Sequence, residues 1–240
     1  MYFRKLRGGI VQLSTRLSAI ASFVPRGSQV IDVGTDHAYI PIYLVETGLA
    51  VSCLATDINK GPLEKAKKNI TAHGINNIEL MQTNGVEGIP ADRGDVLMIS
   101  GMGGYLIVDI LKRGKDLVQN IKRLILQPQQ DIVEVRKYLH AIGFKIVEET
   151  FVKDEEKYYT IIVAEPGQEA PYTHEYQYLY GKCLIEKKIP VFKEWLEMKL
   201  AKQEGIYKAL EHQNTPSAYA RCKELEEEIQ TLREVRKCLN

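Results

Sequence analysis

Short apolar runs alternate with helical segments between residues 30 and 165, and this alternation constrains the fold more than any other feature. Runs such as VLMIS at 96–100 and LILQ at 124–127 are apolar almost throughout. Strands of this kind are expected when helices cover both faces of a parallel sheet. The sequence therefore predicts a doubly wound α/β domain.

The positions of the strands and helices follow from this pattern. The strands are expected at Val30–Val33, Ser52–Thr56, Ile78–Gln82, Val96–Ser100, Arg123–Leu126, Phe144–Glu149 and Tyr158–Ala164. The helices are expected at Leu13–Phe23, Ile40–Thr47, Pro62–His73, Tyr105–Arg113 and Ile132–Ala141. The last two strands are joined by the charged segment VKDEEK, so we expect an antiparallel pair that closes the sheet edge. Such an edge favours a methyltransferase-type sheet over a purely parallel dinucleotide-binding sheet.

The sequence changes character after Glu165, where Pro166, Gly167 and Pro171 indicate a linker. Beyond the linker the pattern is helical, interrupted by HQNTPSA at 212–218. Heptad spacing joins Cys222, Leu225, Ile229, Leu232 and Leu239, with Arg236 at the skipped position. We therefore expect residues 1–165 to form the α/β domain and residues 166–240 to form an antiparallel coiled-coil hairpin.

Composition excludes several classes of protein. The chain has 240 residues, of which 45% are hydrophobic and 26% charged, as expected of a folded globular protein. The scattered cysteines Cys53, Cys183, Cys222 and Cys238 do not have zinc-site spacing, so no metal is expected. No apolar run approaches the ~20 residues of a membrane helix, and the start does not resemble a signal peptide. We expect a cytoplasmic protein with no membrane partner.

Basic residues gather in two places, although the formal net charge is only +1. The first group precedes Asp32, the first acid of the chain, and consists of Arg4, Lys5, Arg7, Arg16 and Arg26. The second group consists of Lys112, Arg113, Lys115, Lys122 and Arg123. These groups are either solvated faces or patches that contact the phosphates of a nucleic acid.

Small and polar residues follow the first four strands, where an open α/β sheet binds its ligands. Asp57, about twenty residues beyond the first loop, stands where a carboxylate accepts hydrogen bonds from both hydroxyls of a ribose. Its alternative role is to cap the next helix. Asn84 and Gly85 can face an adenine ring or form a plain turn. Together these positions predict a site for an adenosine group.

The first loop decides which adenosine compound fits. A dinucleotide needs a glycine-rich cradle for its pyrophosphate, whereas VIDVGTDHAYI at 30–40 offers only Gly34. Asp32 and Asp36 would repel a pyrophosphate, but they suit the cationic sulfonium and amino groups of S-adenosylmethionine. The loop therefore predicts a methyl donor as cofactor and disfavours a nicotinamide oxidoreductase.

Several segments also resemble one family. DVGTDHAYIP, LATDIN, SGMGG and LILQP, followed by a helical extension, are similar to the bacterial tRNA (adenine-22-N1)-methyltransferases. The resemblance covers essentially the whole chain. It implies a class I (Rossmann-like) S-adenosylmethionine-dependent methyltransferase domain with a C-terminal coiled-coil domain. It also implies methylation of N1 of adenine 22 in tRNA, with S-adenosylhomocysteine as product.

The resemblance and the strand ends together name the candidate site residues. Those expected to bind the cofactor are Asp32, Gly34, Asp36, His37, Asp57, Ile58, Asn84, Gly85, Ser100, Gly101, Met102 and Gly103. Those expected to contact tRNA are Arg4, Arg7, Arg16, Arg26, Tyr105, Lys112 and Arg113. Asp36 and His37 are the candidate catalytic pair, because either can stabilise the cationic product or accept a proton; alternatively they only bind the cofactor and cap the next helix.

Other functions and assemblies stay open from the sequence alone. The same fold can methylate a small molecule or a protein, or can persist as a non-catalytic RNA-binding protein. The basic N-terminal region and the helical extension favour tRNA as the partner. We expect a monomer, or a weak dimer that forms through the C-terminal hairpin.

Overall fold

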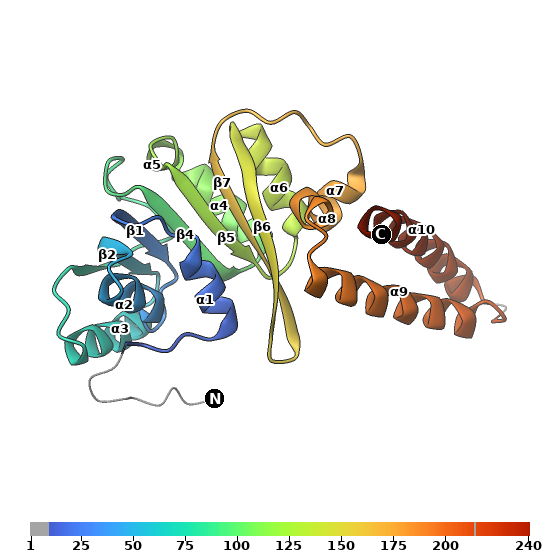
Figure 1. The fold of residues 1–240 in the computed structure, drawn as a ribbon, viewed down its shortest axis with the longest axis horizontal. Helices are drawn as coiled ribbons and strands as arrows, with labels where there is room; N and C mark the ends of the chain where they lie inside the picture. Colours follow the sequence, from blue (N-terminus) through green and yellow to red (C-terminus); the bar gives the residue numbers. More distant parts are fainter. Residues whose placement is uncertain (1–9, 214) are drawn as a thin grey trace. The chain divides into compact units, whose positions relative to one another are not determined.

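The computed structural model describes residues 10–213 and 215–240 (Figure 1). The chain divides into two compact units between Pro171 and Tyr172. The first unit contains a mixed sheet with the strand order β3-β2-β1-β4-β5-β7-β6. Its strands are β1 Ser28–Val33, β2 Ala50–Asp57, β3 Ile78–Gln82, β4 Val96–Met102, β5 Arg123–Pro128, β6 Phe144–Asp154 and β7 Lys157–Pro166. Strands β1 to β5 pair in parallel, and β7 pairs antiparallel with both β5 and β6. The predicted α/β sheet with an antiparallel edge is confirmed.

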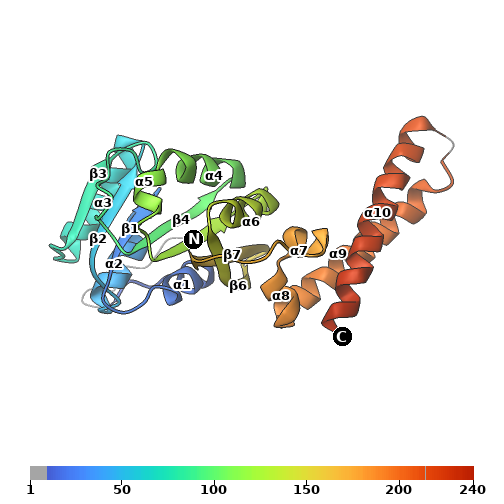
Figure 2. The ribbon, with the colours of Figure 1, turned by 90° about the horizontal axis from the view of Figure 1, so that it is seen from above.

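Helices cover both faces of this sheet (Figure 2). They are α1 Thr15–Ser22, α2 Tyr39–Glu46, α3 Lys60–Ala72, α4 Gly104–Arg113, α5 Lys115–Val118 and α6 Ile132–Ala141. Helices α1, α2 and α3 share one core cluster with Val96 and Met98 of β4. Leu97 and Ile99 are fully buried on the opposite face, because successive strand residues point to opposite sides. Residues Val96–Ile99 of β4 are therefore apolar and buried on both faces of the sheet, as the sequence indicated.

Two elements of the first unit differ from the expected ones. Strand β6 continues five residues beyond Glu149 to Asp154, and β7 begins at Lys157, so the two strands form a long hairpin. The extension TFVKD has only two adjacent apolar residues, Phe151 and Val152, which are too few to form the continuous apolar run expected of a buried strand. The short helix α5 was not predicted, because four residues are too few to show a helical period.

The second unit consists of helices only. They are α7 Glu175–Tyr180, α8 Lys182–Glu186, α9 Pro190–Leu210 and α10 Pro216–Leu239, of which α9 and α10 form the predicted hairpin (Figure 1). The sequence pattern did not separate the short helices α7 and α8 from the long helix α9 that follows them. In the described part of the chain, none of the helices combines the length and the apolar composition that crossing a bilayer needs.

The core stripe of α10 departs from the expected heptad at one position. Val235 is fully buried, whereas Arg236 is partly exposed and lies 3.8 Å from Glu197. A straight helix has 3.6 residues per turn, so a strict seven-residue repeat drifts around it and the stripe moves by one residue. The arginine is therefore not a polar residue inside the hairpin core.

Candidate active site

The carboxyl ends of four strands meet at one edge of the sheet. Strands β2 and β4 pair with β1 on its two sides, and β3 pairs with β2, all in parallel. The order of the chain reverses between β1 and β4, which is where open α/β sheets form their ligand crevice. The loops after β1, β2, β3 and β4 therefore gather at this edge, which we call the carboxyl edge.

The loop after β1 is held tightly by backbone contacts. The N–H groups of Gly34 and Thr35 both donate to the carbonyl oxygen of Thr56, at 2.8 and 2.9 Å. Gly34 has a left-handed φ of +77°, and a Cβ atom there would overlap the side chain of Met102. A glycine is thus required both by the turn and by the close approach of the β4 loop. The cofactor loop and the loop after β4 form one continuous wall.

The side chains of this loop suit a cationic ligand. Asp32 is buried, and its pKa is raised from 3.8 to about 6 by burial and by the nearby Asp57 carboxylate. The buried hydroxyl of Thr35 lies beside this carboxyl and lowers its pKa, which opposes part of the effect of burial. A buried carboxyl with no phosphate cradle beside it fits the amino and sulfonium groups of S-adenosylmethionine.

The raised pKa of Asp32 gives the first prediction. We expect S-adenosylmethionine to bind roughly ten-fold more weakly at pH 5 than at pH 7.5, because the carboxyl is mostly neutral below its pKa of about 6. Binding should tighten as the pH rises through that value, since only the ionised group attracts a cation. Titration calorimetry at several pH values measures the slope of this affinity against pH. Asp32→Asn should flatten it, and an equal slope in that variant would contradict the assignment.

Asp36 and His37 stand at the mouth of the loop. His37 Nε2 lies 3.5 Å from Asp36 Oδ2, and its ring stacks on Tyr39 with centroids 5.2 Å apart. The side chain of Asp36 is 65% exposed, so it is open to a substrate. The N-cap of α2 is Ala38, without a side-chain cap hydrogen bond, so neither Asp36 nor His37 is the N-cap of this helix. The role of the pair toward cofactor or base stays a prediction.

Asp57 ends β2 with one oxygen already anchored. Its Oδ1 accepts the backbone N–H of Asn59 at 2.8 Å, and Asn59, not Asp57, is the N-cap of α3. This contact fixes the carboxylate while its second oxygen stays available to a ribose. The next side chain, Ile58, is 57% exposed and offers an apolar surface beside that position. Such a surface suits one face of an adenine ring.

The loop after β3 approaches α4 closely. The Asn84 amide donates to Glu87 Oε1 at 3.4 Å, and the carbonyl of Gly85 accepts from the Thr56 hydroxyl at the same distance. A Cβ atom on Gly85 would lie 3.0 Å from Ile110 of α4. These contacts pack the loop after β3 against the C-terminal half of α4 and tie it to Thr56, the residue before Asp57.

The last three residues of β4, Ser100, Gly101 and Met102, and the following Gly103 lead into α4; we call these four residues the β4 loop. The ladder between β4 and β5 is irregular between Ser100 and Met102. Gly103 is the N-cap of α4, and the N–H of Gly104 donates to the carbonyl of Gln130 at 2.9 Å. Tyr105, at the start of α4, is 64% exposed and can therefore stack on a base.

A family model for tRNA (adenine(22)-N(1))-methyltransferases matches residues 30–234, which include these loops and most of both units. The chain belongs to this family. It is a methyltransferase that acts on N1 of an adenine in tRNA and uses S-adenosylmethionine. The small-molecule, protein and non-catalytic alternatives are set aside by this membership.

Individual relatives agree with the family in both sequence and fold. The tRNA (adenine(22)-N(1))-methyltransferase of Bacillus subtilis is 34% identical over 94% of this chain and 97% of its own length. A Streptococcus pneumoniae protein, solved in complex with S-adenosyl-L-methionine, is 35% identical with a TM-score of 0.83 and covers 94% of this chain and 100% of its own. The Mycoplasma capricolum enzyme TrmK, solved with S-adenosylhomocysteine, is 26% identical with a TM-score of 0.82, covering 95% of this chain and 99% of its own.

The candidate tRNA-binding residues of this methyltransferase are not all placed at the carboxyl edge. Arg4 and Arg7 lie outside the described residues. Arg16, at the start of α1, does lie there, because its guanidinium approaches Gly101 of the β4 loop. Arg26 precedes β1 and is therefore at the opposite, amino edge.

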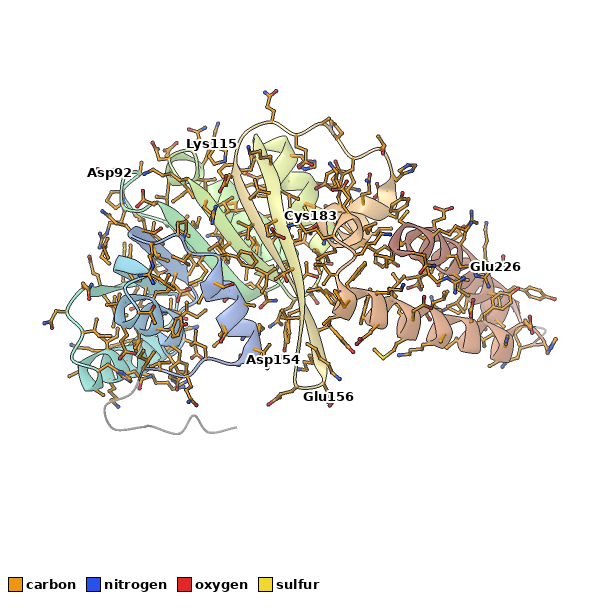
Figure 3. All side chains as sticks on the ribbon, in the orientation of Figure 1. Asp92, Lys115, Asp154, Glu156, Cys183 and Glu226 are labelled. Atoms are coloured by element: carbon orange, nitrogen blue, oxygen red, sulfur yellow. The ribbon has the colours of Figure 1, made fainter. Side chains whose placement is uncertain are left out.

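Most of the second basic cluster is also at the amino edge. Figure 3 labels Lys115 and Asp92 at one end of the sheet, and Asp154 and Glu156 of the β6–β7 hairpin at the other. Several members of the cluster are occupied by acids. Arg113 contacts Glu87 and Asp109, Lys122 contacts Asp95, and Arg123 contacts Glu165. Arg113 reaches the loop after β3, because it contacts the same Glu87 oxygen as the Asn84 amide, whereas Lys115, Lys122 and Arg123 lie at the amino edge.

The sequence search missed the residues that follow β5. Gln127 is fully buried and Gln129 is exposed, and both lie beside the β4 loop. The segment LILQPQQ carried the signal, since β5 is a fifth parallel strand whose carboxyl end meets the same edge. Tyr159, across from this strand on β7, was missed because no local pattern distinguishes it from a packing residue.

Proposed function

We propose that this enzyme binds S-adenosylmethionine over β1, β2 and β3 and presents adenine 22 of tRNA to the loop after β4. The observation that carries the assignment is the convergence of Asp32, Asp57, Asn84 and the β4 loop on one sheet edge. Since tRNA modification takes place where tRNA is processed, we place the protein in the cytoplasm.

The first three strand ends divide the binding of the cofactor between them. When bound, S-adenosylmethionine supplies an electrophilic methyl group on a sulfonium. Asp57 accepts hydrogen bonds from the ribose hydroxyls, Ile58 covers the adenine ring, and Asn84 and Gly85 border its edge. Asp32 and Asp36 balance the positive charges of the methionine part. Ser100 to Gly103 wall the side of the site that faces the target base.

The reaction at the target base asks mainly for alignment. Adenine N1 has a free lone pair, so it attacks in line without a strong base once it is positioned. The methylated base is cationic. Asp36 is exposed toward the substrate side and stabilises that charge, with His37 held beside it, or accepts an N6 proton. Because N1 lies on the Watson–Crick edge, the adenine has to be unpaired or extruded before it enters the site.

The test of the reaction is incubation with labelled S-adenosylmethionine and unmodified tRNA, followed by mapping of the modified nucleoside. We expect the label on N1 of adenine 22. Asp36→Asn should lower turnover by about ten-fold or more while cofactor affinity changes by less than a few-fold, because an exposed carboxylate contributes through charge on the product. The matched control is Asp92→Asn, an exposed acid at the amino edge. If Asp36→Asn instead bound S-adenosylmethionine much more weakly but turned over normally at saturating cofactor, Asp36 would be assigned to cofactor binding alone.

Arg16 is the best-placed described residue for a tRNA phosphate. It is half-buried at the carboxyl edge, and its Nη1 donates to Gln127 Oε1 at 2.8 Å, which leaves further N–H groups available. The slope of the logarithm of the tRNA binding constant against the logarithm of the salt concentration measures this contact. We expect Arg16→Gln to make this slope less steep than in the wild type, and an unchanged slope would argue against the contact. Arg26, Lys112 and Arg113 remain candidates for a wider footprint around the sheet.

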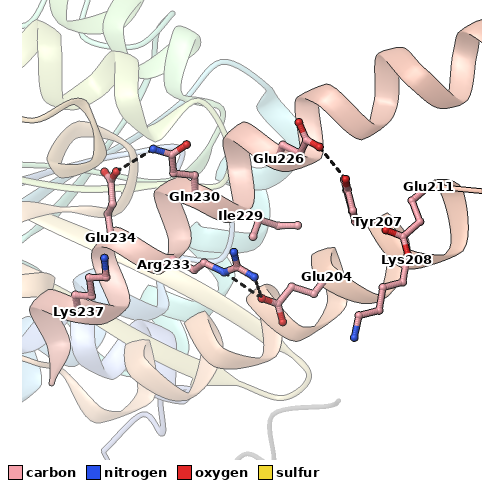
Figure 4. Close-up of a pocket in the computed structure, with 10 residues that line it drawn as sticks. All are labelled: Glu204, Tyr207, Lys208, Glu211, Glu226, Ile229, Gln230, Arg233, Glu234 and Lys237. Atoms are coloured by element: carbon pink, nitrogen blue, oxygen red, sulfur yellow. Dashed lines mark hydrogen bonds and ion pairs between the residues drawn. The ribbon is translucent and has the colours of Figure 1, made fainter.

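The C-terminal hairpin is proposed to extend the tRNA platform and, at most, to form a weak dimer. Charges of both signs pair across it, including Lys199 with Glu228 and Arg233 with Glu204. A groove of about 720 Å³ lies between α9 and α10 and is lined by such pairs (Figure 4). This balance offers no strongly basic face, so its contribution to tRNA binding should depend little on salt. Sedimentation of the whole protein measures the oligomeric state.

A further inference from the structure

We propose that Gln129 reads the Hoogsteen edge of the target adenine and thereby selects adenine while leaving N1 free for methylation. This inference rests on the proposed placement of the target base at the loop after β4. Gln129 follows β5 and lies outside the motifs that bind the cofactor.

The geometry centres on Gly101. This residue has a left-handed φ of +78° and is exposed, so its backbone forms an open floor at the carboxyl edge. The atoms nearest to an added Cβ would be Nε2 of Gln129, at 3.7 Å, and Nη1 of Arg16, at 3.9 Å. A carboxamide and a guanidinium therefore flank the floor on which the proposed base would lie.

The three glutamines after β5 differ in what they can still bind. Gln127 is fully buried; it accepts from Arg16 and donates to the carbonyl of Pro128 at 3.1 Å. Gln130 is also exposed, but its Nε2 lies against Gly103, 3.2 Å from the position of a Cβ there, and no atom of it lies within 4 Å of a Cβ at Gly101. Gln129 is exposed, and its carboxamide has no hydrogen-bond partner in the described part of the chain. Its donor and its acceptor are both free.

The backbone around Gln129 is fixed although the side chain is free. Its N–H donates to the carbonyl of Met102 at 2.8 Å, which ties the segment after β5 to the β4 loop. Arg16 is held in turn by Gln127 and by the ring of Tyr159, 5.3 Å from its guanidinium carbon. The two flanking groups therefore belong to a wall built by α1, β5 and β7.

A glutamine carboxamide matches adenine at N6 and N7. It accepts a hydrogen bond from the N6 amino group and donates one to N7, whereas guanine presents an acceptor, O6, where adenine presents its amino group. This pairing uses the Hoogsteen edge, so the lone pair of N1 stays exposed to the methyl donor. Arg16, whose Nη1 also lies beside Gly101, is then positioned for the phosphate of the same nucleotide.

A cycle that combines a protein variant with a base analogue tests the proposal. The substrates are tRNA with adenosine and tRNA with 7-deazaadenosine at position 22, which removes the N7 acceptor. We expect Gln129→Ala to lower kcat/KM on the normal substrate by about ten-fold or more, and the wild type to lose about five-fold on the analogue. The variant should lose nothing further on the analogue, because the contact is already absent.

The controls separate this contact from other effects. Any change in N1 reactivity caused by the analogue is common to both enzymes and cancels in the cycle. Gln119→Ala changes an exposed glutamine at the C-cap of α5, before β5 begins, and should behave like the wild type. Cofactor affinity and the melting temperature should be unchanged in Gln129→Ala. The proposal would be overturned if the variant and the analogue lowered kcat/KM independently, so that their two effects multiplied. Full activity of Gln129→Ala, or weakened cofactor binding by it, would also overturn the proposal. Failure of the wild type to methylate normal adenine 22 would instead refute the proposed function.

Discussion

Replacing Asp57 with alanine should raise the Kd for S-adenosylmethionine by about 100-fold or more, because hydrogen bonds to a charged group contribute roughly 1.5–3 kcal/mol each and a ribose offers two hydroxyls. The carboxylate is already oriented by the N–H of Asn59, so little entropy is lost when the ribose binds. Titration calorimetry measures the Kd directly.

Two controls make the Asp57 result interpretable. Asp92→Ala removes an exposed acid at the amino edge of the same unit and should leave the Kd within two-fold of the wild type, roughly the scatter expected of a surface change. The melting temperature of Asp57→Ala shows whether the loss of the contact to Asn59 disturbs α3. A Kd that changes less than about five-fold, below one charged hydrogen bond, would show that Asp57 does not hold the ribose.

Replacing Arg136 with alanine should lower the free energy of unfolding by about 3–5 kcal/mol, because it leaves a buried carboxylate without its partner. Arg136 of α6 donates from Nε to Glu149 of β6 at 2.8 Å, and the two side chains are 1% and 0% exposed. Urea denaturation of the whole protein measures the change.

The double variant Arg136→Met with Glu149→Leu provides the contrast. It removes both charges and fills much of the same space, so it should recover most of the lost stability. A single variant that loses less than about 1 kcal/mol, the scale of an exposed ion pair, would mean that water reaches the pair in solution. Loss of α6 packing would also disturb the segment that carries Gln129 and Gln130, so activity and stability should fall together.

Most of the candidate cofactor site could be proposed from the sequence, because each of its parts is a short segment at the end of a strand or directly after it. Asp57, Asn84 and the Ser100–Gly103 loop follow three apolar runs, and parallel strands carry such segments to one edge. The absence of a glycine-rich cradle in the first loop was equally local. These features determined the class of ligand before any contact was known.

The tRNA-facing side could not be predicted in the same way. Arg16 and Lys112 look alike in the sequence, yet Arg16 reaches Gly101 while Lys112 ends α4 at the other edge of the sheet. Helices that connect parallel strands carry one end to each edge, so a cluster of charges in sequence says little about its distance from the site. Gln129 and Tyr159 lie in segments whose importance comes only from their neighbours.

By itself the sequence determined the α/β class, the helical C-terminal region and the acidic, phosphate-free character of the cofactor loop, because these depend on periodicity and on residues next to one another. The tertiary structure decided the raised pKa of Asp32, the place of Arg16 and the availability of Gln129. Burial, charge proximity and unpaired hydrogen-bonding groups arise between segments distant in the chain, and no local pattern encodes them.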